Sequence, residues 1–522
     1  MNLQTAIAEE NQKAESRRRQ QGRLRSVAES NVVHLPPTPN QHFESKFPNV
    51  AEKYGAPVRE EIDNHDRISV AGINEGFFAA ALGEEGQPER PTVRSLIEGR
   101  FYQYDPNEGI FKPISDAALA SQISDVYLEG ARATGAGNVN TDNLEYKFRE
   151  HKNVQGIVNT AKGLLEVSPD YFRGNPRECI AVNNGALRLG DLTLLDHSPR
   201  HRFRSKLAVS FDPSAQCPTY LDFMRSALND EDIETYQKWC GQALTGENIA
   251  QKIILLVGNA GTGKTTAIKI LQGVIGPENF VMLRTSLLTE RFELSRFWAK
   301  TILYAPDVAG DFLNHKGAAV LKSLSGHDPM TIEFKNSNEV PEMVGNKNVI
   351  ITCNSRLVVR LDGDVEAWRR RLGIIPYNKP KPDNPIADLD QLILEREGPG
   401  VLNWMLEGLA KLRADDWQLR LTSSQQMAVD NLLLESDAHS LFVREELEKA
   451  DGSQITVQEL FTAYAEFCNS RGWSALGRNK FGAVIGDIVI RQFGKTISHD
   501  ISDATNSKAQ RGWRGLELRN HS

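Results

Sequence analysis

A glycine-rich stretch near the middle of the chain carries the residues best suited to hold a polyphosphate. It reads LLVGNAGTGKTTAIKIL from Leu255 to Leu271 and satisfies the spacing G-x-x-x-x-G-K-[ST]. Such glycines let backbone N–H groups wrap phosphates at a helix N-terminus, while the lysine reaches the β- and γ-phosphates and the next hydroxyl holds Mg²⁺. We therefore expect ATP and Mg²⁺ as cofactors. The predicted nucleotide-binding residues are Gly258, Asn259, Ala260, Gly261, Thr262, Gly263, Lys264, Thr265 and Thr266.

Two further polar residues follow short apolar runs. Asp307 comes after AKTILYA, where a strand-end carboxylate beside a phosphate loop would share Mg²⁺ with Thr265. Asn354 ends the run NVIITCN, where its amide could hold the attacking water against the γ-phosphate. Many ATP-driven motors carry a second acid after the first, but Val308 stands here. Either Asp307 serves both roles or the base comes from elsewhere, with Asp311 as one candidate.

Arginines near the end of this region are candidates for completing the catalytic set. Arg370 and Arg371 stand just before the apolar run LGIIPY. In this position they could act as arginine fingers that reach the γ-phosphate held by a neighbouring subunit. An arginine triplet alone more often forms a solvated helix face, and the position after Asn354 is what favours the catalytic interpretation.

The elements expected around these residues indicate an α/β fold. KIILLV, AKTILYA and NVIITCN are short, apolar and β-branched, as in strands buried on both faces of a sheet. Apolar residues after the glycine stretch recur at i, i+3, i+4 and i+7 and predict a helix that Gly276 ends. They are Ala267, Ile268, Ile270, Leu271, Val274 and Ile275.

The chain as a whole is predicted to form five parts. Asn184-Gly185 lies between apolar runs and predicts a tight hairpin turn in the second part. The last part should contain two helices followed by a hairpin, as winged-helix domains do. The expected divisions are a disordered or partly helical tail (1–45), an α+β domain (46–240), a P-loop ATPase domain (241–380), a helical segment (381–437) and a winged-helix-like domain (438–522).

Composition excludes several classes of protein. The 522 residues include 40% hydrophobic and 25% charged side chains, which is ordinary for a soluble globular protein. No run approaches the roughly 18 apolar residues of a membrane span, and the N-terminal residues lack an apolar secretory core, so we expect no membrane contact. Five scattered cysteines form no C-x-x-C pair, which fits a reducing cytoplasm. The net charge of −7 excludes general polyanion binding, so any nucleic-acid contact must be local.

The motifs together resemble those of superfamily 3 helicases, specifically the phage, plasmid and poxvirus-type primase-helicase family. The shared order is P-loop, acid-ended strand, lysine-bearing hairpin, asparagine-ended strand and arginine, with LKSLSGHDPMTIEFKNSNEV as the hairpin segment. VNNGALRLGDLTLLDHSPRHRFRSKLAVSFDPSAQCPTYLDFM resembles the domain that flanks the motor in this family, and EGPGVLNWMLEGL resembles the helices that follow it. The resemblance covers roughly residues 95 to 520.

This resemblance implies an AAA+-like core that forms a ring, commonly a hexamer, and moves along single-stranded DNA, with 3′ to 5′ polarity. Lys335 would grip DNA at the hairpin tip, with Asn336 beside it and Phe334 supporting the hairpin. Replication of a phage, phage satellite or plasmid in the cytoplasm of a bacterial host is the implied role. Residues 1–95 contain neither a D-x-D pair nor zinc-ligand spacing, so we expect a primase on a separate chain, together with an origin-binding factor.

Other functions remain open from the sequence. The ATPase could instead be an initiator or regulator that melts DNA without processive unwinding. A P-loop enzyme acting on a small molecule needs neither the hairpin nor the trailing arginines, whereas an RNA helicase or packaging motor fits the same motifs. The C-terminal part either binds duplex DNA or docks another protein, and its candidate DNA contacts are Arg478, Lys480, Arg511 and Arg514.

Overall fold

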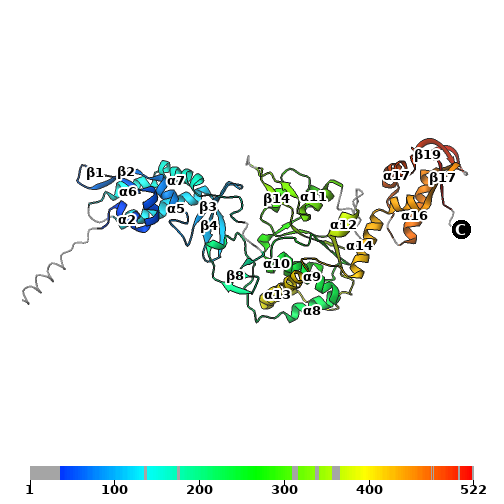
Figure 1. Ribbon diagram of the computed structural model, residues 1–522, viewed down its shortest axis with the longest axis horizontal. Helices are drawn as coiled ribbons and strands as arrows, with labels where there is room; N and C mark the ends of the chain where they lie inside the picture. Colours follow the sequence, from blue (N-terminus) through cyan, green and yellow to red (C-terminus); the bar gives the residue numbers. More distant parts are fainter. Residues whose placement is uncertain are drawn as a thin grey trace, which may run out of the picture. The chain divides into compact units, whose positions relative to one another are not determined.

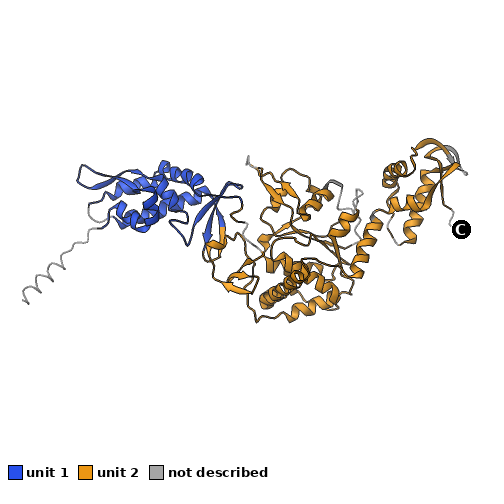
Figure 2. Cartoon of the chain, in the orientation of Figure 1, with its two compact units in different colours: residues 1–105, 112–169 blue, residues 106–111, 170–522 orange. Residues whose placement is uncertain are grey.

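The chain folds into two compact units. The computed structural model describes residues 36–134, 138–172, 177–308, 315–335, 340–354, 365–471, 473, 475–503 and 506–519. One unit comprises the chain up to Asp105 together with Lys112–Pro169, and the other comprises Pro106–Phe111 with Asp170–Ser522 (Figure 2). The sequence had grouped residues 46–240 as one domain, whereas the contacts divide that stretch after Pro169.

The first unit is a mixed α and β structure around an aromatic core. Phe43 is fully buried in this core and meets the rings of Phe78 and Tyr127 edge to face. Phe43 lies on α2, which a capping box between Thr38 and Gln41 begins, so residues 39–45, placed in the expected tail, belong to a helix that packs into this core. The elements are α2 (Pro39–Lys46), α3 (Pro48–Tyr54), β1 (Val58–Ile62), β2 (Ile68–Ile73), α4 (Glu75–Ala80), β3 (Thr92–Ser95), β4 (Arg100–Asp105), β5 (Ile110–Ile114), α5 (Asp116–Ala133), α6 (Thr141–Arg149), α7 (His151–Leu164) and β6 (Glu166–Val167).

The second unit is built on a five-stranded parallel sheet. Its strand order is β11-β12-β15-β10-β16, so the chain crosses over between strands and places all their carboxyl ends at one edge. The three runs predicted as buried strands are β10, β12 and β15, which confirms an α/β fold with a parallel sheet. The strands are β10 (Ile253–Val257), β11 (Phe280–Met282), β12 (Ile302–Ala305), β15 (Asn348–Cys353) and β16 (Leu372–Pro376).

Helices cover both faces of this sheet (Figure 1). Ile254 and Leu256 of β10 pack on one face against α8, α9, α10 and α13, whereas Ile253 and Leu255 pack on the other face against α11, α12 and α14. This alternation explains why β10 is apolar at every position. The helices are α8 (Pro218–Ala227), α9 (Asp230–Ala243), α10 (Lys264–Ile275), α11 (His315–Ser325), α12 (Val365–Arg371), α13 (Leu389–Ala414) and α14 (Ser423–Ser436), with short 3₁₀ turns η2 (Pro277–Asn279), η3 (Thr285–Leu287) and η4 (Leu294–Phe297).

The helix α10 and the hairpin near Asn184 were both predicted from the sequence. The predicted apolar residues of α10 are all buried, and Gly276 ends the helix with φ of 95°, as expected. The hairpin near Asn184 exists, but Val182 pairs with Gly185, so its turn is Asn183-Asn184 rather than Asn184-Gly185. A Cβ on Gly185 would collide with the Leu195 carbonyl, so close strand approach explains this glycine. The sheet there consists of β7 (Cys179–Val182), β8 (Gly185–Arg188) and β9 (Thr193–Leu195), followed by η1 (Pro199–His201).

The C-terminal elements have their own hydrophobic core, which includes the fully buried Trp513. The two predicted helices and the hairpin are present, and α15 and β17 precede them. β17 was missed because its sequence, LEKADGSQIT, is polar and lacks the alternation of a half-buried strand. The elements are α15 (Ala438–Glu446), β17 (Leu447–Thr456), α16 (Val457–Ser470), α17 (Arg478–Phe493), β18 (Ser498–Asp503) and β19 (Asn506–Leu518), with sheet order β17-β19-β18. Across the described parts of the chain, no helix is both long and apolar enough to traverse a bilayer.

Candidate functional site

The glycine loop, residues 258–263, connects the carboxyl end of β10 to the N-terminus of α10. Gly258 has no room for a side chain, because a Cβ there would lie 2.3 Å from the Tyr377 carbonyl oxygen. Gly261 and Gly263 adopt φ values of 84° and 99°, a region that side chains disfavour. The loop is therefore held in a conformation that these glycines permit, with its backbone next to the positive end of a helix.

Lys264 is buried and folds back onto the glycine loop. Its Nζ donates hydrogen bonds to the carbonyl oxygens of Gly258 (2.6 Å) and Asn259 (2.8 Å), and the residue is 4% exposed. Burial lowers the pKa of Lys264, and the carboxylate of Asp307 opposes this shift in part. An ammonium ion with only carbonyl partners in a buried position is suited to meet an anion. Thr265 is exposed beside it and Thr266 is half-buried.

Asp307 and Asn354 meet at the carboxyl ends of the adjacent strands β12 and β15. The Asn354 side-chain N–H donates to Oδ1 of Asp307 at 3.0 Å. The backbone N–H of Asp307 donates to the Thr352 hydroxyl at 3.1 Å, and Val308 N–H donates to the Thr352 carbonyl at the same distance. Thr352 thus holds Asp307 in a left-handed conformation, with φ of 39°. No sequence motif pointed to Thr352, a hydroxyl inside an apolar strand.

The residues fit a magnesium ion of the kind that nucleotides bring with them. In the described portion of the chain, no three His, Cys, Asp or Glu side chains group as metal ligands. Mg²⁺ commonly takes only one or two protein ligands and completes its shell with phosphates and water. Asp307 and Thr265 offer one exposed carboxylate and one exposed hydroxyl, which matches that requirement.

The three arginine side chains at the end of α12 differ in their contacts. Arg369 forms ion pairs with Asp430 of α14 (2.8 Å) and with Glu366. Arg371 donates to the Ala367 carbonyl and packs against Gly326, and its Nε is buried without a partner. Arg370 is exposed and makes no hydrogen bond or ion pair with any described residue. Of the two predicted finger residues, Arg371 is thus engaged within the unit, whereas Arg370 has no partner among the described residues.

The predicted hairpin is formed by β13 (Pro329–Thr331) and β14 (Glu342–Val344), paired antiparallel. Lys335 is exposed beyond β13, while Phe334 packs edge to face on Trp298 with ring centroids 5.9 Å apart. Glu333 pairs with Arg291 at 2.6 Å. Sequence reasoning missed Trp298 and Arg291, because a support of this kind appears only once the chain is folded. Asn336 and Asp311 lie outside the described residues.

The candidate DNA-binding cations of the C-terminal part are on its surface. Arg514 pairs with Asp500 at 2.8 Å and is thereby partly neutralised. Arg478, Lys480 and Arg511 are exposed on α17 and β19.

Comparison with known protein families gives two matches, to separate stretches of the chain. Residues 256–371 match a family described as a family of unknown function (DUF5906), and residues 117–229 match one described as D5 N terminal like. The first stretch contains every predicted nucleotide-site residue from Gly258 to Arg371. The second match supports a phage primase-helicase type of family, in agreement with the sequence motifs. A search of curated proteins finds no match.

Solved structures with related features include three of the NrS-1 C terminal region. The A form apo structure is 13% identical to this chain, with a TM-score of 0.46. The match covers 82% of this chain and 97% of that structure's chain. An A form apo structure of residues 305–718 is 11% identical, and the match covers 97% of its chain. An apo structure of the same residues is 12% identical, and the match covers 96% of its chain. Each of these two matches covers 82% of this chain with a TM-score of 0.43. These TM-scores are too low to establish a shared fold.

Proposed function

We propose that the chain is an ATP-driven DNA helicase of superfamily 3 that acts in the replication of a phage, phage satellite or plasmid. The observation that carries the proposal is the hydrogen bond between Asn354 and Asp307 at the sheet edge where Lys264 also stands. A buried cation, a strand-end carboxylate and a water-orienting amide together are the parts that nucleotide hydrolysis requires. Gly258, Asn259, Ala260, Gly261, Thr262 and Gly263 would cradle the phosphates of ATP, and Thr266 would line the start of α10.

Hydrolysis would proceed through positioning and charge. Lys264 would exchange its two loop carbonyls for the β- and γ-phosphates, so that binding costs little rearrangement. Thr265 and Asp307 would hold Mg²⁺, which would supply positive charge to the phosphates. Asn354 is held by Asp307 and would orient water for attack. With Val308 after it, Asp307 would serve as both metal ligand and acceptor of the water's proton.

A ring of subunits, commonly six, would complete each site. Arg370 has no partner among the described residues, and an arginine supplied by a neighbour typically accelerates such hydrolysis by about 10³- to 10⁵-fold. Arg371 is packed against Gly326 and would support this helix end. Turnover in this scheme requires assembly, so dilution of the protein should reduce the rate per chain.

DNA contact would come from the hairpin of the same unit. Lys335 would meet the phosphates of single-stranded DNA, a contact that is sequence-independent and weakens with salt. Phe334 on Trp298 and Glu333 on Arg291 would transmit movement of the surrounding elements to Lys335. The C-terminal part, a proposed winged helix, would bind duplex DNA near an origin, with a primase on a separate chain and the complex in the host cytoplasm.

The deciding experiment measures ATP hydrolysis with and without single-stranded DNA for the parent, Lys335→Ala and the control Lys449→Ala. Lys449 is an exposed lysine without a partner among the described residues, on β17. We expect DNA to stimulate the parent and the control, and Lys335→Ala to keep basal turnover but lose the stimulation. Stimulation without displacement of a duplexed strand would favour an origin-melting initiator instead. Absence of any DNA effect in the parent would refute the motor.

A further inference from the structure

The segment that follows β16 runs along the glycine loop and is anchored at two points. The backbone N–H of Tyr377 donates to the Val257 carbonyl at 2.7 Å, and the Tyr377 side chain is fully buried. The Nζ of Lys379 donates to the Arg225 carbonyl near the end of α8, also at 2.7 Å. Pro380 then restricts the backbone. The position of the next residue is therefore set by the fold rather than by a free loop.

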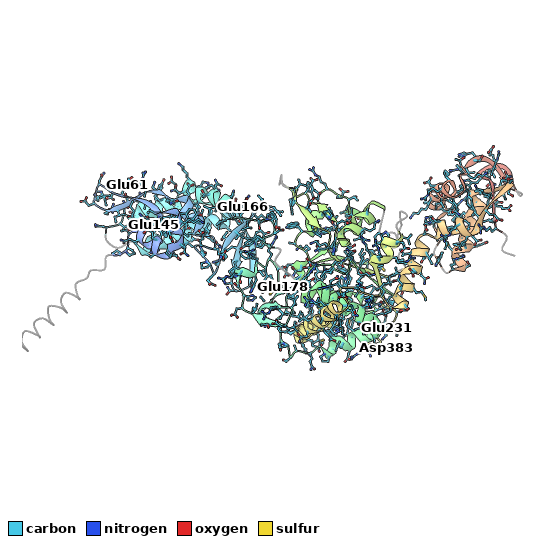
Figure 3. The ribbon with its side chains drawn as sticks, in the orientation of Figure 1. Glu61, Glu145, Glu166, Glu178, Glu231 and Asp383 are labelled. Carbon is cyan, nitrogen blue, oxygen red and sulfur yellow. The ribbon has the colours of Figure 1, made fainter. Side chains whose placement is uncertain are left out.

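That next residue, Lys381, lies over the glycine loop. A Cβ built on Gly261 would be 3.0 Å from Cε of Lys381 and 3.3 Å from its Nζ. Lys381 is exposed, and no described residue accepts a hydrogen bond or forms an ion pair with it. Asp383, labelled in Figure 3, is two residues further along the segment and makes no ion pair with Lys381.

The ammonium of Lys381 thus joins a region that is already positive. The backbone N–H groups of the loop, the N-terminus of α10 and the buried ammonium of Lys264 all carry charge of the same sign. Like charges at short range repel one another, and a multivalent anion relieves that repulsion. An unpaired lysine held in this place is explained by such an anion.

We propose that Lys381 is a second phosphate-binding lysine of the site, which contacts the polyphosphate of a bound nucleoside triphosphate from the side of the loop opposite to the protein interior. The inference rests on the proposed nucleotide binding and adds a residue that the loop motif does not contain. Its contribution is expected for ATP and ADP, whose phosphate chains carry several charges. AMP, with one phosphate, gains least.

The test is a fluorescence titration of the full chain with mant-ATP and mant-ADP in the presence of Mg²⁺. Loss of a hydrogen bond to a charged group weakens binding by about 10-fold, so we expect the Kd of Lys381→Ala to rise by about 10-fold for both nucleotides. Lys381→Arg keeps the charge and should bind within about 3-fold of the parent. Lys449→Ala is the matched control and should bind as the parent does. Melting temperatures without nucleotide should agree for all variants.

The possible results distinguish a failure of the Lys381 proposal from a failure of the proposed nucleotide binding. If Lys264→Ala abolishes mant-ATP binding while Lys381→Ala binds like the parent, the proposal for Lys381 is wrong and the nucleotide site stands. If Lys381→Ala and Lys381→Arg are equally weak and both melt earlier, Lys381 has a structural role and the proposal is also wrong. If the parent itself does not bind mant-ATP, both the proposed function and this inference are refuted.

Discussion

Replacing Gly258 by alanine should disable nucleotide binding through a backbone collision alone. The added Cβ would lie 2.3 Å from the Tyr377 carbonyl oxygen, whereas ordinary contact begins near 3.4 Å. About 1 Å of separation must therefore be created between the glycine loop and the end of β16. Both partners are backbone and cannot rotate aside as a flexible side chain could.

The loss of activity in Gly258→Ala depends on how far the glycine loop is displaced. A loop displaced by about 1 Å no longer presents its N–H groups and Lys264 in the geometry that the phosphates require, and misplacement of this size costs about 100-fold in rate. The same overpacking should destabilise the unit by about 1–3 kcal/mol. We expect Gly258→Ala to lose most mant-ATP binding and ATPase activity and to melt earlier than the parent.

A matched control exists in the same unit. Gly190 has nothing within 4 Å of an added Cβ, so Gly190→Ala should retain both binding and melting temperature. The assays are mant-ATP titration, steady-state ATP hydrolysis and thermal denaturation of both variants beside the parent. Parent-like nucleotide affinity in Gly258→Ala would refute the placement of phosphates on this loop.

Three further changes address other parts of the unit. Asn354→Ala should lower the maximal rate of ATP hydrolysis by about 100-fold while leaving mant-ATP affinity near that of the parent, because the amide orients water rather than holding phosphates; a loss of affinity instead would contradict this role. Phe334→Ala gives up the edge-to-face contact with Trp298, worth about 0.5–1.5 kcal/mol, and should reduce DNA stimulation of hydrolysis at unchanged basal turnover. Burial lowers the pKa of Lys347 to about 8 from 10.5, so the folded state disfavours its charged form. The free-energy cost of burying the charged ammonium is complete below pH 8 and fades as the pH rises to 10.5. Lys347→Met should therefore stabilise the unit at pH 7 by up to about 3 kcal/mol, and thermal melts near pH 10 should show no such gain.

The parallel sheet was predictable because its signals are local. Short, mostly apolar runs, IILLV, ILYA and VIITC, identify β10, β12 and β15 without knowledge of their neighbours. The same holds for α10, whose periodicity and terminal Gly276 are both contained in one stretch. Asp307 and Asn354 could be placed near each other since the carboxyl ends of parallel strands share one edge.

What escaped prediction depends on contacts between distant residues. Thr352 holds Asp307 across 45 positions, and Trp298 supports Phe334 across 36, with no motif to reveal either. Lys381 became visible only when the chain after β16 was seen to return over Gly261. The hairpin turn was misplaced by one residue because Asn183, Asn184 and Gly185 all favour turns, and the strand pairing selects among them.

The position of β10 between two other strands determines when this unit can fold during synthesis and which of its fragments can fold. β10 is flanked by β15 and β16, which are completed only when the chain has reached Cys353 and Pro376. A nascent or truncated chain that ends at Arg371 would leave one edge of IILLV without a partner, and an apolar strand with an open edge invites aggregation. Most of this unit's order must therefore be acquired late in translation. A fragment cut to residues 218–371, which contains β10 but not β16, should be insoluble, whereas one extended through α14 to residue 436 should fold.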